Sequence, residues 1–330
     1  MKKFTVVLLV LFVTGSLFAN GNTETKTLIG IAMPETHGWM KDGASLKAEA
    51  EKRGYRAEVQ YGNADQALQN QHIQNFLTHG AKVLIVNCIN DDVAPIIDNA
   101  GSKGVKVIAY DKLIQNTDGY DYYITFNNFK VGELQAQSIV AGLKLDTATA
   151  AVPRTITLFA GSPTDANAFF FFDGAMSILN PYIDKGVLRV IGPYPSTSAD
   201  TAAFQRIATE NWRADLAKTR METLLNTDAR SVTLDAILAP NDALARAILE
   251  ACKADARYQS KQPVISGKEA EFDSAKLAEA AILLADQIFK GQDPDIHGAV
   301  LASGDLEAIG DTGPKVVKAY LLDPVLVTKN

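Results

Sequence analysis

The sequence predicts an α/β protein made of two doubly wound lobes, each a parallel sheet with helices on both faces. Three observations support this fold class: strand and helix patterns alternate along nearly the whole chain, glycines close the helices, and the loops between elements are short. Repeated βαβ units require all three features. No low-complexity linker divides the chain, so we expect hinge strands to join the two lobes.

The first half alternates regularly. Strands are expected at 28–33, 55–61, 82–88 and 105–110, and helices at 43–53, 65–79 and 93–103. Gly54, Gly80 and Gly104 directly follow these helices, because glycine readily adopts the left-handed conformation that ends a helix. The segment 82–88 has a fully apolar centre, VLIV, which is typical of a strand buried on both faces.

The pattern restarts after 111–121. Further strands are expected at 122–125, 155–159, 188–191, 236–238 and 264–266, with helices between them. Two doubly wound halves joined near 111–121 fit this order better than one very wide sheet.

The chain begins with a pattern typical of a secretory signal peptide. A basic start, MKK, precedes an apolar run from Thr5 to Phe18 that ends at Ala19. At about 14 residues the run is shorter than the roughly 20 that a membrane span needs. We expect cleavage near Ala19, so that 1–19 are removed and the mature chain is exported. No cysteine lies near that position, which argues against a lipid anchor.

Composition excludes several classes of function. The chain has 330 residues, of which 47% are hydrophobic and 21% charged, as in ordinary globular proteins. The net charge of −6 argues against binding to nucleic acid or to anionic membranes. Cys88 and Cys252 are the two cysteines, and we expect both to be buried free thiols.

The usual catalytic and cofactor motifs do not occur in the sequence. There is no GxGxxG after a strand, no GxxxxGK[ST] and no GxSxG. The four histidines lack the close pairing of a metal site, and His72 and His79 are expected on a helix surface. We therefore expect neither a cofactor nor a bound metal.

Segment 155–176 carries the most informative functional signal. An apolar strand ends at Gly161, a polar loop containing Asp165 and Asn167 follows, and phenylalanines occupy 169–172. Aromatic faces beside Asp and Asn suit a sugar, whose C–H faces stack while its hydroxyls need donors and acceptors. The alternative is a helix start in which Asp165 or Asn167 is the cap and the phenylalanines are core residues.

Similar polar or aromatic positions recur just past other predicted strands. They are Trp39, Asp111, Lys112, Asn167, Asn241, Asp242, Lys268 and Glu269. In doubly wound sheets, such positions line the ligand crevice. Any one of them alone is more often a cap or turn residue, but their recurrence in both halves favours a binding site.

Seven motifs, in order along the chain, carry a family resemblance. They are GIAMP at 30–34, KVIAYDKLI at 106–114, TFNNFKVGELQA at 125–136, GSPTDANAFFFFDGAM at 161–176, LAPNDALARAI at 238–248, VISGKEAE at 264–271 and AYLLDPVLVTK at 319–329. From about Leu28 to Lys329 the chain resembles the periplasmic sugar-binding proteins of ABC transporters, type I fold, in the branch that takes aldoses such as xylose, glucose and galactose.

The resemblance implies an organisation and a function. Residues 27–111 and about 270–300 would form the N-terminal lobe, and 112–269 and about 301–330 the C-terminal lobe, with the ligand cleft between them. A monomer in the periplasm would close over one monosaccharide and deliver it to an ABC transporter permease. The same closed form could instead present the sugar to a chemoreceptor or sensor kinase. An enzyme is the alternative of another class: an exported sugar hydrolase using Asp111 and Glu269 as an acid–base pair.

The resemblance also implies roles for individual residues. Trp39 and Trp212 would stack on the sugar from the two lobes. The residues that would contact the hydroxyls or cover the ring are Asp111, Lys112, Asp165, Asn167, Phe169, Asn241, Asp242, Lys268 and Glu269.

The chain departs from the family pattern at three places. Lys112 stands where Arg is usual and so lacks the planar fork that grips two hydroxyls. Glu269 stands where Asp is usual, and Lys268 where Gln is usual. After Glu271 roughly twenty residues are absent, which would remove an edge strand of the first lobe and a ligand-facing lysine. We therefore expect weaker aldose binding than is usual for the family, and a first lobe less stable than the second.

Overall fold

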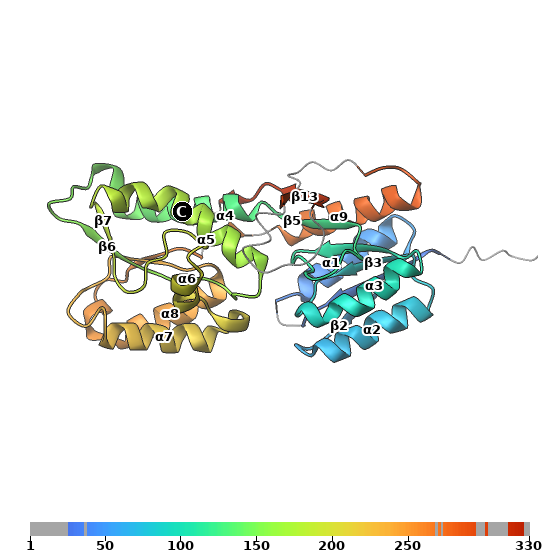
Figure 1. Ribbon diagram of the computed structural model, residues 1–330, viewed down its shortest axis with the longest axis horizontal. Helices are drawn as coiled ribbons and strands as arrows, with labels where there is room; N and C mark the ends of the chain where they lie inside the picture. The colour runs from blue at the N-terminus through green and yellow to red at the C-terminus, as the bar shows by residue number, and fades with distance from the viewer. Residues whose placement is uncertain are drawn as a thin grey trace, which may run out of the picture.

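The computed structural model describes residues 26–35, 38–267, 270–271, 273–294, 301–302 and 316–326. Within these residues it confirms the predicted fold class, with two lobes that lie side by side and each contain a parallel sheet (Figure 1). The predicted signal peptide lies outside the described residues.

The first sheet has six parallel strands in the order β13-β5-β4-β3-β1-β2. The strands are β1 (Leu28–Met33), β2 (Arg56–Tyr61), β3 (Val83–Val86), β4 (Lys106–Tyr110), β5 (Tyr122–Phe126) and β13 (Ala319–Leu322). One face packs against α1 (Met40–Lys52) and α9 (Ser274–Phe289), and the other against α2 (Gln66–Thr78) and α3 (Ala94–Ser102). A 3₁₀ turn, η1 (Asp91–Val93), precedes α3. Successive residues of β1 and β3 point to opposite faces, so these strands are apolar throughout.

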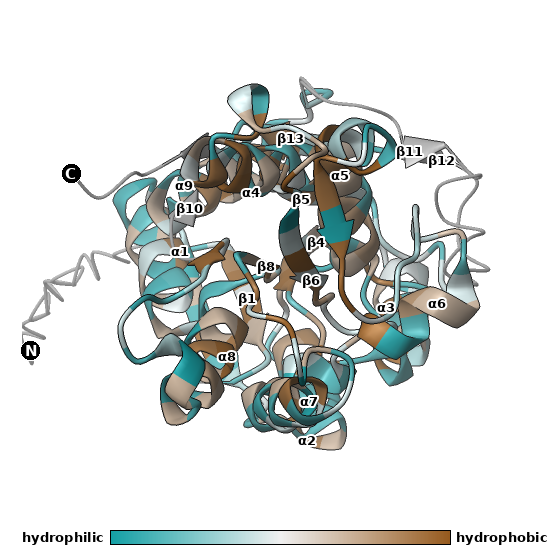
Figure 2. Ribbon diagram, turned by 90° about the vertical axis from the view of Figure 1, so that its left-hand side faces the viewer, coloured by the Kyte–Doolittle hydropathy of each residue, from teal (hydrophilic) through white to brown (hydrophobic). Residues whose placement is uncertain are grey.

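The second sheet has four parallel strands in the order β7-β6-β8-β9. These are β6 (Arg154–Leu158), β7 (Leu188–Val190), β8 (Ala236–Leu238) and β9 (Val264–Ile265). One core lies under α4 (Asn128–Leu143), α5 (Ala166–Asp184) and α6 (Thr201–Ile207), the other under α7 (Ala214–Asn226) and α8 (Asp242–Ala254). Figure 2 shows mainly hydrophobic strands at the centre, and helices around them that alternate between hydrophilic and hydrophobic residues.

Short elements complete the described chain. They are the 3₁₀ turns η2 (Leu145–Thr147), η3 (Glu210–Trp212) and η4 (Ala256–Tyr258), the pair β10 (Ala270–Glu271) with β14 (Val325–Leu326), and the pair β11 (Leu301–Ala302) with β12 (Val316–Val317). The helix α9 begins at Ser274, almost directly after β10, as the short sequence in this region predicted.

Two strands lie in a different sheet from the one that the sequence suggested. The segments 122–125 and 301–330 were assigned to the second lobe, but β5 pairs with β4 and β13 pairs with β5 in the first sheet. A short connection joins β4 to β5, and the two strands pair with each other. The chain therefore crosses to the second sheet only after β5. It returns after β9. The sequence pattern of a strand is the same in either sheet, so only its hydrogen-bonded pairing shows which sheet it joins.

Two glycines let α4 and α5 cross at close range. A Cβ at Gly132 would lie 2.0 Å from the carbonyl oxygen of Phe171, and one at Gly174 would lie 2.0 Å from that of Phe129. The crossing holds the start of α5 against the first lobe, where Ala166 and Phe171 join its two core clusters. The polar loop before α5 is thereby brought to the carboxyl ends of the first-lobe strands.

Candidate functional site

Asp111 lies directly after β4 and has a strained backbone held by three hydrogen bonds. Its φ of 63° is in the left-handed region, which Asp tolerates better than most residues. Its N–H donates to the Ile124 carbonyl oxygen (2.8 Å). Its own carbonyl oxygen accepts from Tyr123 Oη (3.1 Å) and Asn167 Nδ2 (3.0 Å). The bond from Asn167 joins the second lobe to the first.

The Asp111 side chain shares its surroundings with two other carboxyls. Burial is the main cause that raises the pKa of Asp111 to about 8; the charges of Asp165 and Asp42 add to it, and Lys112 opposes them. The three acids come from β4, the loop before α5, and α1. Carboxyl groups from both lobes therefore lie within electrostatic range of one another.

Lys112 is tied to the loop that follows β3. Its Nζ donates to the Ile89 carbonyl oxygen (2.9 Å). Burial lowers the pKa of Lys112, but the acidic groups around it, including Asp165 and Asp91, raise it above its ordinary value. The ammonium group is therefore a fixed positive charge among the acids.

Asp165 and Asn167 connect the second lobe to the polar residues around Asp111. Asp165 caps α5, since its Oδ1 accepts from the Asn167 N–H (3.0 Å), and its Oδ2 accepts from Trp212 Nε1 (3.0 Å). Asn167 Oδ1 accepts from Tyr123 Oη (3.1 Å) and from Asn128 Nδ2 (2.6 Å). Both side chains are buried. The cap interpretation is thus correct for Asp165, while Asn167 bridges the lobes.

The two tryptophans lie at the margin of one apolar cluster. Trp39 precedes α1 as its N-cap residue, and Trp212 ends η3 with a φ of 55°. Both pack against the first-lobe cluster beneath α1 and α9, and Trp212 also meets the edge of Phe171, with ring centroids 6.3 Å apart. The Trp212 indole lies against Gly161, where a Cβ would come within 2.1 Å of it. Only glycine leaves room for the ring there.

Phe169 takes a different place from the one predicted. Its ring is buried and stacks on Phe204, with centroids 4.6 Å apart, inside the second-lobe core. The alternative that treated the phenylalanines as core residues holds for this position, because its side chain points into the sheet-facing side of α5. Phe171, two residues on, is the phenylalanine that contacts a candidate site residue.

Asn241 and Asp242 lie at the carboxyl end of β8. Asn241 caps α8, accepting from the Leu244 N–H (2.9 Å), and Asp242 lies 3.5 Å from Arg246 one turn along the helix. Gly267 packs closely on this loop, since a Cβ there would lie 2.7 Å from the Asn241 carbonyl oxygen. Lys268 and Glu269, which follow Gly267, lie outside the described residues.

Asp42 belongs to the same neighbourhood but was not predicted. It is buried in the first turn of α1, and its Oδ1 accepts from Tyr110 Oη (2.8 Å). Burial raises the pKa of Asp42. The available signal in the sequence was an acidic residue three positions after Trp39. Acidic residues are common in the first turn of a helix, where they interact favourably with the helix dipole, so this one did not stand out.

The described part of the chain offers no metal site. No group of three His, Cys, Asp or Glu side chains that could hold a metal ion occurs among the described residues. Within the same ranges, no helix is long and apolar enough to span a membrane. The candidate site is therefore one of carboxyl, amide, ammonium and indole groups at the strand ends of two lobes.

Comparison with known proteins assigns the family. The sequence pattern described as "Periplasmic binding protein domain" matches residues 29–301. The chain belongs to the periplasmic binding protein family. It is 36% identical to the multiple sugar-binding periplasmic receptor ChvE of Rhizobium radiobacter, over 92% of this chain and 87% of the relative. It is 30% identical to the D-xylose-binding periplasmic protein of Escherichia coli K12, over 96% and 92%.

Solved structures agree with this assignment. An ABC transporter solute-binding protein from Clostridium phytofermentans with bound β-D-glucose has a TM-score of 0.78 and 30% identity, over 91% of this chain and 94% of that one. A carbohydrate transporter solute-binding protein from Chloroflexus aurantiacus, in complex with D-glucose, has a TM-score of 0.76 and 29% identity, over 91% and 92%.

The alignment lengths bear on the expected deletion. The match to the multiple sugar-binding periplasmic protein SbpA of Azospirillum brasilense runs over 349 positions, more than the 330 residues of this chain. That alignment must therefore open gaps in this periplasmic binding protein. The deletion expected after Glu271 stays a prediction.

Proposed function

We propose that this periplasmic binding protein captures one monosaccharide, an aldose, between its lobes and delivers it to an ABC transporter permease. The observation that carries the proposal is the meeting of Asp111 and Asp165. They come from different lobes, lie within electrostatic range, and are connected through Asn167 beside the Trp212 indole.

These groups suit the surface of a sugar. Carboxyl oxygens accept from hydroxyl groups, and charged acceptors form the stronger bonds. A carboxyl whose pKa lies near neutrality, as at Asp111, can also be protonated and then donate a hydrogen bond to a sugar oxygen. The indole of Trp212 offers an apolar face for the C–H side of the ring, and its N–H is already satisfied by Asp165.

The names of the relatives agree with this chemistry. The proteins from Rhizobium radiobacter, Azospirillum brasilense and Escherichia coli are named as sugar-binding or D-xylose-binding periplasmic proteins. We infer that this chain is a binding protein rather than an enzyme, and that it is exported after cleavage near Ala19. Because the sugar touches both lobes, it stabilises the closed arrangement more than the open one and shifts that equilibrium.

A thermal-shift screen of the chain without 1–19 against aldopentoses and aldohexoses tests the proposal. A ligand that binds only the folded protein stabilises it by about 4 kcal/mol at a thousandfold excess over its Kd. We expect one or a few aldoses to raise the melting temperature, while sugar alcohols of the same size give a smaller shift. A screen in which no monosaccharide changes the melting temperature would refute the proposal.

The export step has its own measurement. Mass spectrometry of the protein recovered from the periplasm should give a chain that starts after Ala19. A periplasmic chain that still carries Met1 would contradict the signal-peptide prediction.

A further inference from the structure

Asn87, the residue after β3, has a buried side chain with an unused donor. Only 2% of its surface is exposed. Its backbone is fully paired, because its N–H donates to the Ala32 carbonyl oxygen (3.0 Å) and its own oxygen accepts from Gln69 Nε2 (2.8 Å). Its side-chain Nδ2 is buried and has no hydrogen-bond partner among the described residues. Buried donors almost always have a partner, so this one calls for an acceptor.

The position of Asn87 in the sheet is that of a ligand contact. In the order β2-β1-β3-β4, the strand β2 is added on one side of β1, and β3 and β4 are added on the other side. Ligands bind at such a switch point, outside the carboxyl ends of the strands. The register pairs Val86 with Ala32 and with Ala109, so Asn87 is level with Met33 and Tyr110. The alternation of side chains places it on the α1 face, with Tyr110.

The loop that carries Asn87 is rigid and is joined to the candidate site. Gln66 Oε1 accepts from the N–H groups of Ile89 (3.1 Å) and Asn90 (2.8 Å). The Ile89 carbonyl oxygen accepts from Lys112 Nζ. The next residue, Cys88, lies within electrostatic range of both Lys112 and Asp165. Asn87 is therefore held firmly beside the groups that we assign to the sugar.

Two polar groups on the same side of the sheet, Tyr110 and Asp42, leave the donor unpaired. Tyr110 Oη donates its proton to Asp42, and neither side chain accepts from Asn87. We propose that Asn87 is a further recognition residue of the first lobe, whose Nδ2 donates to a hydroxyl oxygen of the bound monosaccharide. This inference rests on the proposed function. Its alternative is an internal water molecule that satisfies the donor with or without sugar.

Asn87→Leu distinguishes a sugar contact from an internal water molecule, because leucine has nearly the same shape as asparagine and no polar group. Removing an unsatisfied buried donor leaves stability unchanged or higher, whereas removing a ligand contact lowers affinity. Thr157→Val is the matched control. Thr157 lies within β6 of the second lobe, is fully buried, and its Oγ1 likewise has no partner among the described residues.

Titration calorimetry with the aldose found by screening should give about tenfold weaker binding for Asn87→Leu and unchanged binding for Thr157→Val. The melting temperature of sugar-free Asn87→Leu should equal or exceed that of the parent. Monodeoxy analogues then identify the contact: the analogue that lacks the hydroxyl facing Asn87 should bind parent and variant equally. If Asn87→Leu lowers the affinity by the same factor for every analogue, the inference is overturned.

Two further outcomes are decisive. If the parent binds the aldose and Asn87→Leu binds it within twofold, Asn87 is no sugar contact and the proposed function stands. If the parent binds no monosaccharide, the proposed function fails and this inference fails with it. Should Asn87→Leu not fold, Asn87→Ala replaces it, and the same criteria apply to its affinities.

Discussion

At the scale of single residues, Asp111 joins the backbone of one lobe to the side chains of the other. Its left-handed φ turns the chain away from β4 and exposes its carbonyl oxygen to Tyr123 and Asn167. Strain of this kind persists only where the surroundings fix it, and it occurs most often at functional sites. The same turn places the buried carboxyl group within range of the charges of Asp165, Asp42 and Lys112.

The raised pKa of Asp111 predicts how stability depends on pH. The folded carboxyl titrates at about 8 and the ordinary value is 3.8, so between these values the folded state binds a proton that the unfolded state has lost. Stability therefore falls as pH rises from about 4 to about 8. Asp111→Asn should be more stable than the parent at pH 8 and equal to it at pH 4, and asparagine also tolerates the left-handed backbone. Thermal denaturation of both proteins across this range measures the effect, and an equal difference at every pH would contradict the assignment.

Gly161→Ala tests the place of the Trp212 indole. The added methyl group would lie 2.1 Å from the ring, which must move, while the backbone at Gly161 needs no left-handed φ. We expect a loss of about 1–3 kcal/mol in the free energy of unfolding and about tenfold weaker aldose binding. Gly142→Ala is the control, because its Cβ meets Val264 at 2.8 Å at the opposite end of the second sheet. Equal affinities for the two variants would show that the indole does not touch the sugar.

Residue identities predicted only part of this site. Asp165, Asn167, Asp111 and Lys112 stood out because they follow strands directly. Asp42 and Asn87 did not, because their importance depends on burial and on the strands beside them, which a single sequence does not show. Phe169 was misplaced because an aromatic residue at a helix start can face either a ligand or a core.

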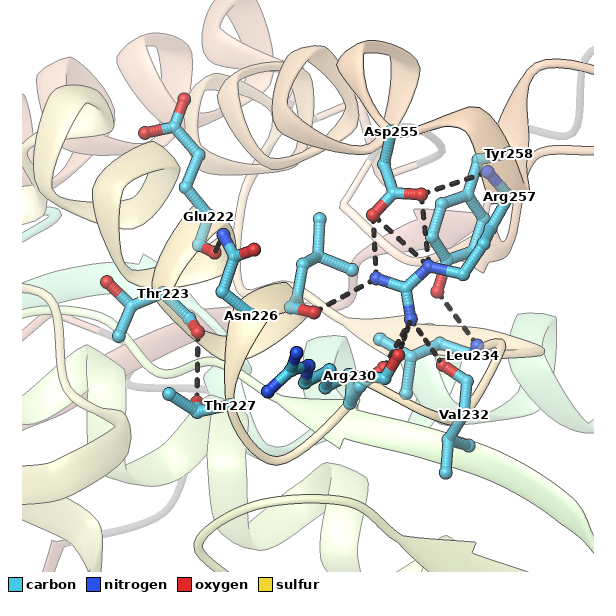
Figure 3. Close-up of polar contacts among 12 residues, drawn as sticks. Glu222, Thr223, Asn226, Thr227, Arg230, Val232, Leu234, Asp255, Arg257 and Tyr258 are labelled. Atoms are coloured by element: carbon cyan, nitrogen blue, oxygen red, sulfur yellow. Dashed lines mark hydrogen bonds and ion pairs between the residues drawn. The ribbon is translucent and has the colours of Figure 1, made fainter.

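At the scale of elements, an arginine clamp holds together the end of the second lobe opposite the site (Figure 3). The Arg257 guanidinium donates to the carbonyl oxygens of Leu225, Ala229, Arg230 and Val232 at and after the end of α7. It also forms an ion pair with Asp255 (2.6 Å), and next to it Tyr258 Oη accepts from the Leu234 N–H (2.9 Å). One side chain therefore caps α7 and fixes the entry into β8.

Replacing this arginine should weaken the lobe without weakening the site. Arg257→Met leaves several carbonyl oxygens without their donor and removes the ion pair of Asp255, and we expect a loss of about 2–4 kcal/mol in the free energy of unfolding. Arg189→Met is the control, since Arg189 is exposed and its side chain has no hydrogen bond or ion pair among the described residues. Aldose affinity should be unchanged in both. Denaturant unfolding that gives the two variants equal stability would disprove the clamp.

The elements themselves were largely predictable, and their pairing was not. Glycines marked the helix ends, and apolar runs marked the buried strands, because both signals are local. The sheet to which β5 and β13 belong depends on long-range hydrogen bonding, and the sequence assigned both to the second lobe. The α4–α5 crossing depends on Gly132 and Gly174, whose role appears only when the two helices are in contact.

At the scale of the whole molecule, the two sheets direct their carboxyl ends towards a shared group of polar side chains. The chain passes from the first sheet to the second after β5 and returns after β9, so the second sheet is built from one continuous segment and the first sheet from two. Under the proposed function, this arrangement allows a single ligand to contact both lobes and favour their closure. Weaker aldose binding and a less stable first lobe, which we expect from an apparent deletion after Glu271, stay predictions.

The measurement that tests the account most directly is a crystal structure of the protein with the aldose that raises its melting temperature most. We expect one sugar molecule at the carboxyl ends of both sheets, within hydrogen-bond distance of Asp111 and Asp165 and in contact with the Trp212 ring. A sugar bound elsewhere, or bound to one lobe alone, would contradict the account.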